Sequence, residues 1–127
     1  MEKLNLSGRW RNQHGSELDL KIGEDGRVHG SFRSAVGDVD QDAEFEVVGV
    51  QSGDLVAFCT DFHGQGVTAW AGQYTAHEFE EELLTQWHLA LDVSEVEEPD
   101  WLWSGVRTGE DRFVRLREPE PEQTTPR

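Results

Sequence analysis

The feature that most constrains this chain is a regular alternation of apolar and polar residues in short runs that end at glycine-containing turns. Over residues 16–22 every second residue is small or apolar, and the residues between them are Glu17, Asp19 and Lys21. The following residues 23–26, Gly-Glu-Asp-Gly, are typical of a tight hairpin turn. Because successive side chains of a β-strand point to opposite faces, this pattern predicts half-buried antiparallel strands.

Similar runs recur along the rest of the chain. The sequence predicts strands over residues 6–12, 16–22, 27–34, 44–50, 55–60, 67–75, 81–91 and 105–116. Eight sequential antiparallel strands in an open sheet would leave two unpaired edges, and closing the sheet removes both of them. We therefore expect an all-β fold, an eight-stranded antiparallel up-and-down β-barrel. The interior of such a barrel is just wide enough for side chains or one small ligand.

Length and charge limit the domain organisation and the partners. The chain has 127 residues and one cysteine, which fits a single domain over residues 1–116 without an internal disulfide. Residues 117–127 are rich in Pro and Glu, so we expect an acidic, disordered tail. The net charge of −15 argues against nucleic acid and anionic membranes as partners. Without a signal-peptide or membrane-spanning run, the sequence predicts a soluble protein. Its compartment stays open: secreted or periplasmic if a signal peptide was trimmed, otherwise cytoplasmic.

Signatures of catalysis and of metal binding are nearly absent. His77-Glu78 resembles the opening of a zinc-protease motif, but the residue that should complete it is Glu81. Acidic residues alternate over 38–42 as in a calcium loop, yet Ala43 stands where that loop needs glycine, and its twelfth position is Gly49. We therefore predict that the protein is not an enzyme and holds no metal and no cofactor.

Tryptophans and small polar residues share the inward-facing positions of the predicted strands. Four of the five tryptophans lie in or beside strands, where aromatic residues usually fill a core: Trp10, Trp70, Trp87 and Trp103. The same faces carry the polar residues Asn12, Ser16, Ser34, Thr68 and Asp111. A barrel interior cannot bury so many polar groups without hydrogen-bond partners. A polar ligand would supply these partners.

Two other functions are consistent with a small acidic barrel. One is a protein-interaction or protease-inhibitor module, whose interior would be filled with layers of apolar side chains. The other is a lipocalin-like carrier, whose pocket would be mostly apolar. The inward-facing polar residues argue against both, and we keep both as alternatives to a polar-ligand binder.

Five segments resemble the avidin and streptavidin family of biotin-binding proteins, in the family's order and at nearly its spacing. They are GRWRNQHGS at 8–16, GSFRSAVG at 30–37, TAWAGQY at 68–74, TQW at 85–87, and Trp103 followed by GEDRF at 109–113. The resemblance covers about residues 6–116. It implies the eight-stranded barrel predicted above, with biotin bound at one end.

By position, the resemblance implies which polar residues would hold biotin. Asn12, Ser16 and Ser34 would hydrogen-bond the ureido group, and Asp111 would lie behind it. Thr68 would face the thioether sulfur. The chemistry is coherent, because a polarised urea oxygen needs several donors and each urea N–H needs an acceptor, for which a carboxylate is well suited.

The resemblance also assigns the apolar part of the pocket. Trp70, Trp87 and Phe58 would form the walls around the bicyclic ring, with Phe58 in place of a family tryptophan. Val36 occupies a further ligand-binding position. Trp103 resembles the tryptophan that caps the pocket of a neighbouring subunit, although Trp101, two residues earlier, is an alternative for this role.

Three positions depart from the family pattern. Phe32 replaces a ligand-binding tyrosine whose hydroxyl would donate to the ureido oxygen, a loss worth about 1 to 3 kcal/mol. Gly66 replaces a serine near the valerate carboxylate of biotin, and Asp38 replaces a neutral residue near the same carboxylate. Since like charges repel, we expect weaker binding of free biotin than is typical of the family and a preference for amidated biotin, as in biotinylated lysine.

The predicted outer faces of two strands are apolar, which favours self-association. These residues are Leu55, Ala57 and Cys59 on one strand and Val67, Ala69 and Ala71 on the next. Dimeric members of the family generally replace the capping tryptophan with a disulfide. Because this chain has Trp103 and only one cysteine, the resemblance implies a homotetramer.

Overall fold

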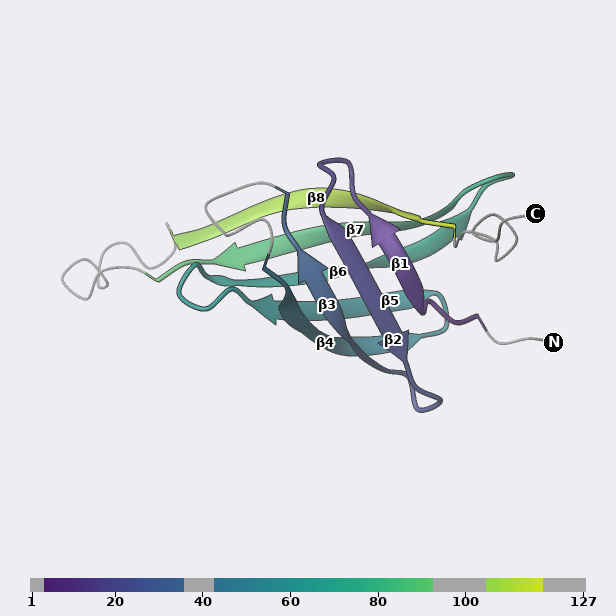
Figure 1. Cartoon of the computed structure of the whole chain (residues 1–127), viewed down its shortest axis with the longest axis horizontal. Helices are drawn as coiled ribbons and strands as arrows, with labels where there is room; N and C mark the ends of the chain where they lie inside the picture. Colours follow the sequence, from purple (N-terminus) through teal and green to yellow (C-terminus); the bar gives the residue numbers. More distant parts are fainter. Residues whose placement is uncertain (1–3, 36–42, 93–104, 118–127) are drawn as a thin grey trace, which may run out of the picture.

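The computed structural model describes residues 4–35, 43–92 and 105–117. It contains eight strands: β1 Gly8–Arg11, β2 Glu17–Ile22, β3 Arg27–Arg33, β4 Phe45–Ser52, β5 Leu55–Asp61, β6 Val67–Ala76, β7 Glu81–Ala90 and β8 Val106–Arg115. Each strand pairs antiparallel with the next, and β8 pairs with β1 to close the barrel (Figure 1). The predicted eight-stranded antiparallel barrel is therefore confirmed. No helix of the described ranges could cross a membrane.

The strand boundaries differ from the predicted ones by up to two residues, most clearly in β1, which is shorter at both ends. The alternating run begins at Leu6 and reaches Asn12, but β1 contains only residues 8–11. At its end, the backbone N–H of Asn12 donates to the carbonyl of Ser16 at 3.0 Å, and the side-chain oxygen of Asn12 accepts from the N–H of Ser16 at 2.9 Å. The hydrogen bonds of Asn12 thus start a turn at a position where the alternation alone predicts that the strand continues.

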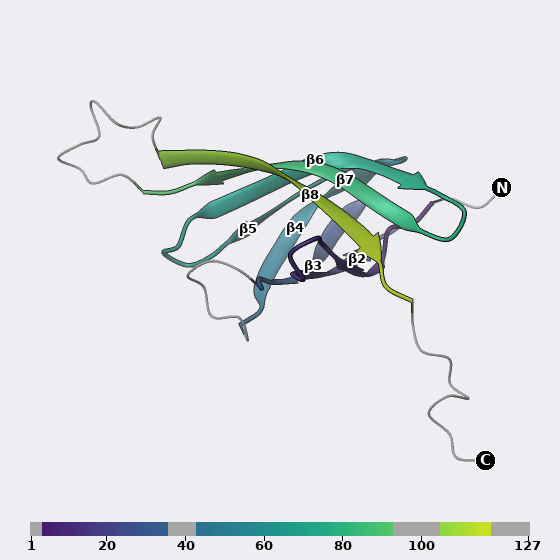
Figure 2. The ribbon, with the colours of Figure 1, turned by 90° about the horizontal axis from the view of Figure 1, so that it is seen from above.

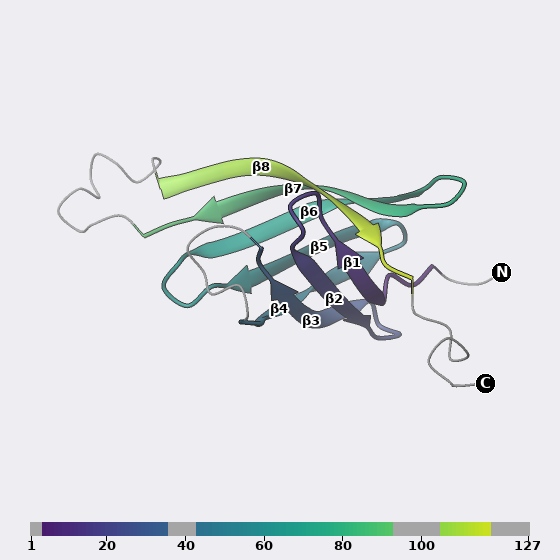
Figure 3. The ribbon, with the colours of Figure 1, turned by 45° about the horizontal axis from the view of Figure 1, so that its top comes forward.

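The up-and-down order divides the connections between two ends of the barrel. The β1–β2 turn and the β5–β6 turn lie at one end, which we call the open end. The β2–β3, β4–β5 and β6–β7 turns lie at the other, the closed end, where β1 begins and β8 ends (Figures 1 and 2). Strands β6, β7 and β8 each have ten residues and form the longest hairpins of the barrel (Figure 3).

The core follows the predicted alternation. The buried apolar side chains are Leu6, Trp10, Leu18, Leu20, Val28, Phe32, Val47, Val56, Phe58, Trp70, Leu83 and Phe113. They come from every strand and from the segment before β1. The charged residues between them on β2 face outward, as the pattern predicts.

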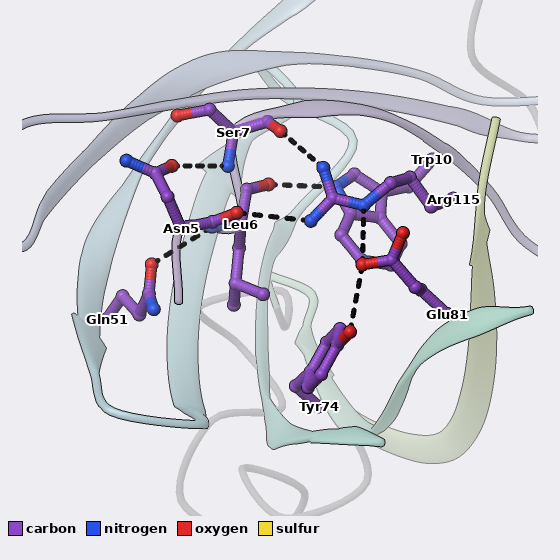
Figure 4. A network of polar contacts seen from close by, with 8 residues as sticks. All are labelled: Asn5, Leu6, Ser7, Trp10, Gln51, Tyr74, Glu81 and Arg115. Carbon is purple, nitrogen blue, oxygen red and sulfur yellow. Dashed lines mark hydrogen bonds and ion pairs between the residues drawn. The ribbon is translucent and has the colours of Figure 1, made fainter. Parts of the chain in front are cut away.

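Arg115, the last residue of β8, binds the segment that precedes β1 at the closed end (Figure 4). Its Nη1 and Nη2 donate to the backbone oxygens of Ser7 at 2.6 Å and of Asn5 at 3.1 Å, and its Nε lies 3.2 Å from Oε1 of Glu81. Its guanidinium lies over the Trp10 ring, 4.5 Å from the centroid. One side chain thus links β8, β7 and the segment before β1.

Gln51, on β4, holds the same segment from the other side. Its Oε1 accepts from the N–H of Leu6 at 3.3 Å, and its Nε2 donates to the carbonyl of Leu4 at 3.0 Å. Leu6 is fully buried, and its carbonyl accepts from the indole N–H of Trp10 at 3.0 Å. The segment before β1 therefore fills the interior of the barrel at the closed end.

Candidate binding site at the open end of the barrel

A cavity of about 370 Å³ lies at the open end of the barrel. It is lined by Asn12, His14, Ser16, Phe32, Ser34, Phe62, Gln65, Thr68, Trp70, Trp87, Leu89, Leu91 and Asp111. Eight of the twelve residues that the sequence predicts for the site are among them. The volume is in the range of small-ligand sites in proteins.

Two donors at this cavity are set by the β1–β2 turn. The side-chain oxygen of Asn12 accepts from the backbone N–H groups of His14 at 3.0 Å and Ser16 at 2.9 Å. Because that oxygen is committed to the turn, the amide nitrogen of Asn12 is the atom left to donate into the cavity. The hydroxyl oxygen of Ser16 accepts from the N–H of Ala35 at 2.8 Å, so its own hydrogen is also left to donate.

Two further hydroxyl groups lie in the same cavity. Ser34 follows the end of β3 and is 7% exposed, and Thr68, the second residue of β6, is 5% exposed. Both hydroxyl groups add polar atoms to the lining of the cavity, and a few such groups are what orients a ligand in a small-molecule site.

Asp111 supplies a buried acceptor in the same cavity. The indole N–H of Trp70 donates to its Oδ2 at 2.9 Å, and the side-chain amide of Gln13 donates to its Oδ1 at 3.1 Å. A carboxylate has about four acceptor sites, so both oxygens retain capacity for a ligand donor. With Asn12 and Ser16 as donors and Asp111 as acceptor, the site suits a group that carries a carbonyl beside an N–H.

Aromatic rings form the apolar walls. Phe32 packs against Trp70 with ring centroids 5.0 Å apart, and Trp87 lines the cavity from β7. Phe58 stacks on Trp70 at 5.0 Å and 22° but does not itself line the cavity. The structure thus places Phe58 behind the wall tryptophan, where it supports the ring.

Gly109 makes room for one of these rings. It pairs with Trp87 in the β7–β8 ladder, and a Cβ atom at position 109 would lie 2.3 Å from Cζ2 of the Trp87 indole. Any larger residue on β8 at this point would therefore move the ring.

Five cavity residues were not predicted from the sequence: His14, Phe62, Gln65, Leu89 and Leu91. Three of them lie in turns, where alternation gives no information about which way a side chain points. Phe62 packs edge-on against Phe32, with centroids 5.9 Å apart and an interplanar angle of 66°. The signal that could have found Phe62 is its apolar ring within an otherwise polar turn.

Gly66, which stands where the resemblance places a family serine, has a backbone conformation that disfavours any residue with a side chain. Its φ is +113°, and a Cβ at this position would lie 2.8 Å from both the carbonyl of Ala90 and Cδ1 of Leu89. The neighbouring Gln65 lines the cavity instead. Near Gly66, the polar group that lines the cavity is therefore the side-chain amide of Gln65.

Several predicted positions lie outside the described residues. They are Val36 and Asp38, the two alternative capping residues Trp101 and Trp103, and the tail from residue 118 onward. Among the described residues that line the cavity, Asp111 is the only one counted as charged at neutral pH, and none is Lys or Arg. The described parts of the chain contain no cluster of three His, Cys, Asp or Glu side chains that could hold a metal ion.

Comparison with known proteins identifies the family. The model of the avidin family matches residues 1–116. A crystal structure of xenavidin is 28% identical, covers 91% of this chain and 100% of its own, and superposes with a TM-score of 0.79. A rhizavidin–biotin complex is 22% identical, with 92% and 100% coverage and a TM-score of 0.78. A second rhizavidin structure is 23% identical, with 94% and 88% coverage and a TM-score of 0.77. The family match spans all eight strands of the described barrel, so this chain belongs to the avidin family.

Proposed function

We propose that the protein binds biotin through its ureido ring in the cavity at the open end of the barrel. The observation that carries the proposal is that donors from Asn12 and Ser16 and the buried carboxylate of Asp111 line one cavity. The ureido oxygen would accept from the two donors, and a ureido N–H would donate to Asp111. Membership of the avidin family supports the proposal, as does the solved complex of the similar protein rhizavidin with biotin.

The rest of the cavity fits the rest of the ligand. The Trp70 and Trp87 rings would pack on the bicyclic ring, with Thr68 near its sulfur. A buried carboxylate would be unfavourable against a wholly apolar ligand, so Asp111 disfavours a lipocalin-like carrier. The proposed role is binding, with no chemical step and no cofactor.

A tryptophan-fluorescence titration tests the proposal, because Trp70 and Trp87 line the cavity. Biotin should produce a saturable change in emission. The matched control ligand is the diamine obtained by opening the ureido ring, which keeps the sulfur ring and the valerate chain. We expect no saturable change with the diamine in the same concentration range. Equal responses to both ligands, or none to biotin, would refute recognition of the ureido group.

We further propose a preference for amidated over free biotin. The described lining residues offer no cation to a free carboxylate, and the chain carries a net charge of −15. We expect a biotinyl amide to bind roughly fivefold to tenfold more tightly than free biotin at low ionic strength, with the difference shrinking as salt screens the charges. Calorimetry with both ligands at two salt concentrations measures it, and the variant Asp38→Asn should narrow the difference. Tighter binding of free biotin would contradict the charge argument.

Gly109 offers a test of the wall on which biotin would pack. The variant Gly109→Ala should displace the Trp87 ring, because the added Cβ would lie 2.3 Å from the indole. We expect biotin to bind about tenfold to a hundredfold more weakly, the effect of losing roughly 1.4 to 2.8 kcal/mol of ring contact. The matched control is Gly23→Ala, where the added Cβ would meet only the Asp25 side chain, at 3.1 Å. Unchanged affinity in Gly109→Ala would show that the Trp87 ring does not contact the ligand.

We propose that the barrel forms a homotetramer through its outer apolar face. Leu55 on β5 and Val67 on β6 are 53% and 49% exposed, and exposed alanines lie between them on both strands. Sedimentation velocity should give about four times the 14.4 kDa chain mass. The double variant Leu55→Lys with Val67→Lys should lower that mass, because it would bury charges in the interface. A monomeric wild-type protein would contradict the proposal.

A further inference from the structure

Gln13, in the β1–β2 turn, bonds to three groups of β8. Its Nε2 donates to the carbonyl of Glu110 at 2.9 Å and to Oδ1 of Asp111 at 3.1 Å. Its Oε1 accepts from the backbone N–H of Arg112 at 2.8 Å. Three bonds from one exposed side chain are unusual, because an exposed glutamine ordinarily bonds to water.

The side chain of Gln13 takes the place of a backbone peptide group that β1 would offer to β8 if β1 were longer. Strands β1 and β8 pair only at Trp10 with Arg115 and at Arg11 with Val114, since β1 ends at Arg11. On the N-terminal side of Val114, the edge of β8 that faces β1 has no strand residue of β1 paired with it. The primary amide of Gln13 bonds to the next carbonyl and N–H of β8 as a peptide group of a neighbouring strand would.

The same amide fixes the carboxylate at the cavity. Asp111 is 7% exposed; Gln13 holds its Oδ1 and the Trp70 indole N–H holds its Oδ2. Two donors on opposite oxygens determine the rotation of the carboxylate plane. The backbone N–H of Arg112 donates to Oε1 of Gln13, and this bond determines which way the amide of Gln13 faces, so that its NH₂ group points to Asp111.

We propose that Gln13 is a positioning residue for ligand binding: it holds the carboxylate of Asp111 in the orientation that accepts a ureido N–H. This inference rests on the proposed biotin site. It adds that recognition depends on a side chain that does not line the cavity. Gln13 acts through Asp111, the one charged group among the described lining residues.

The test begins with the ligand-free protein. The variant Gln13→Met keeps the length of the side chain and removes both its donor and its acceptor. We expect the Trp70 indole N–H signal in a proton–nitrogen NMR spectrum to shift and its hydrogen exchange to quicken, while the Trp10 indole signal stays unchanged. Gln86→Met, the same substitution at an exposed position of β7, is the matched control. An unchanged Trp70 signal in a folded Gln13→Met protein would overturn the inference.

The second arm measures biotin affinity in two backgrounds. Gln13→Met should weaken binding about tenfold in the wild-type background, the effect of roughly one hydrogen bond to a charged group. In the Asp111→Ala background the same substitution should change affinity less than twofold, because the group it positions is gone. Equal losses in the two backgrounds would overturn the inference, since Gln13 would then act on the fold as a whole.

A second variant guards against a failure of Gln13→Met to fold. Gln13→Glu keeps an acceptor for the N–H of Arg112 but places a carboxylate against Asp111, so it should perturb the Trp70 signal in the same way. Wild-type affinity with an unperturbed signal in Gln13→Glu would overturn the inference. If the wild-type protein fails to bind biotin, the proposed function is wrong, while the Trp70 signal still decides whether Gln13 orients the carboxylate.

Discussion

Replacing Asp111 with alanine should weaken biotin binding about a hundredfold to a thousandfold, a loss of about 3 to 4 kcal/mol. The carboxylate is the only formally charged acceptor among the described residues of the cavity, and it is buried at 7% exposure. Its removal would take away the proposed charge-assisted hydrogen bond to the ureido N–H, and it would leave the Trp70 indole N–H, which lies 2.9 Å from Oδ2, without its acceptor.

Titrations that follow tryptophan fluorescence measure this loss. The matched control is Glu110→Gln, which removes a carboxylate of the same strand that faces solvent. We expect the control to bind biotin within about twofold of the wild type, because solvent and salt screen the charge of an exposed carboxylate. Similar affinities for Asp111→Ala and the wild type would place the ureido group elsewhere.

The variant Arg115→Met should lower the free energy of unfolding by about 3 kcal/mol, because it breaks several partly buried interactions of one cation at once. It leaves the carbonyls of Asn5 and Ser7 without their donor and Glu81 without its cation. Glu81 also accepts from the Tyr74 hydroxyl at 2.8 Å. Burial, and then this bond and the charge of Glu81, raise the pKa of Tyr74 above its ordinary value of 10.0, so Tyr74 stays a neutral donor at pH 7.

Urea denaturation at pH 7 tests this expectation. The control is Arg27→Met on β3, an exposed arginine with no ion pair to any of the described residues, which should change stability by less than about 0.5 kcal/mol. Because Arg115 lies at the closed end, biotin affinity of folded Arg115→Met should stay within about twofold of the wild type. A stability loss no larger than that of the control would mean that residues 4–7 are held by Gln51 and by the burial of Leu6 alone.

The barrel was predictable because its determinants are local and repeat along the chain. Alternation over 16–22 sets which face of β2 is buried, and Gly23 to Gly26 sets where the chain reverses. Closure then follows from the cost of open edges. The inward placement of polar residues such as Ser16 and Thr68 was readable for the same reason, since both lie in phase with buried positions.

Other parts of the site depend on contacts that no periodicity encodes. Phe62 and Gln65 lie in a turn, and the cavity-facing direction of their side chains is set by the packing of neighbouring strands. Phe58 is in phase with the interior, as predicted, but its depth in the barrel places it behind Trp70. Gln13 joins β8 across nearly 100 residues of sequence, and only the closed barrel brings the two together.

Calorimetric titration of the wild-type protein with biotin tests the central claim most directly. The proposed site predicts saturation at one biotin per chain, together with a rise in the thermal unfolding temperature, since a ligand that binds only the folded state stabilises it. Absence of both binding heat and any thermal shift at millimolar biotin would contradict the claim. The barrel would then stand, with a cavity built for a different polar ligand.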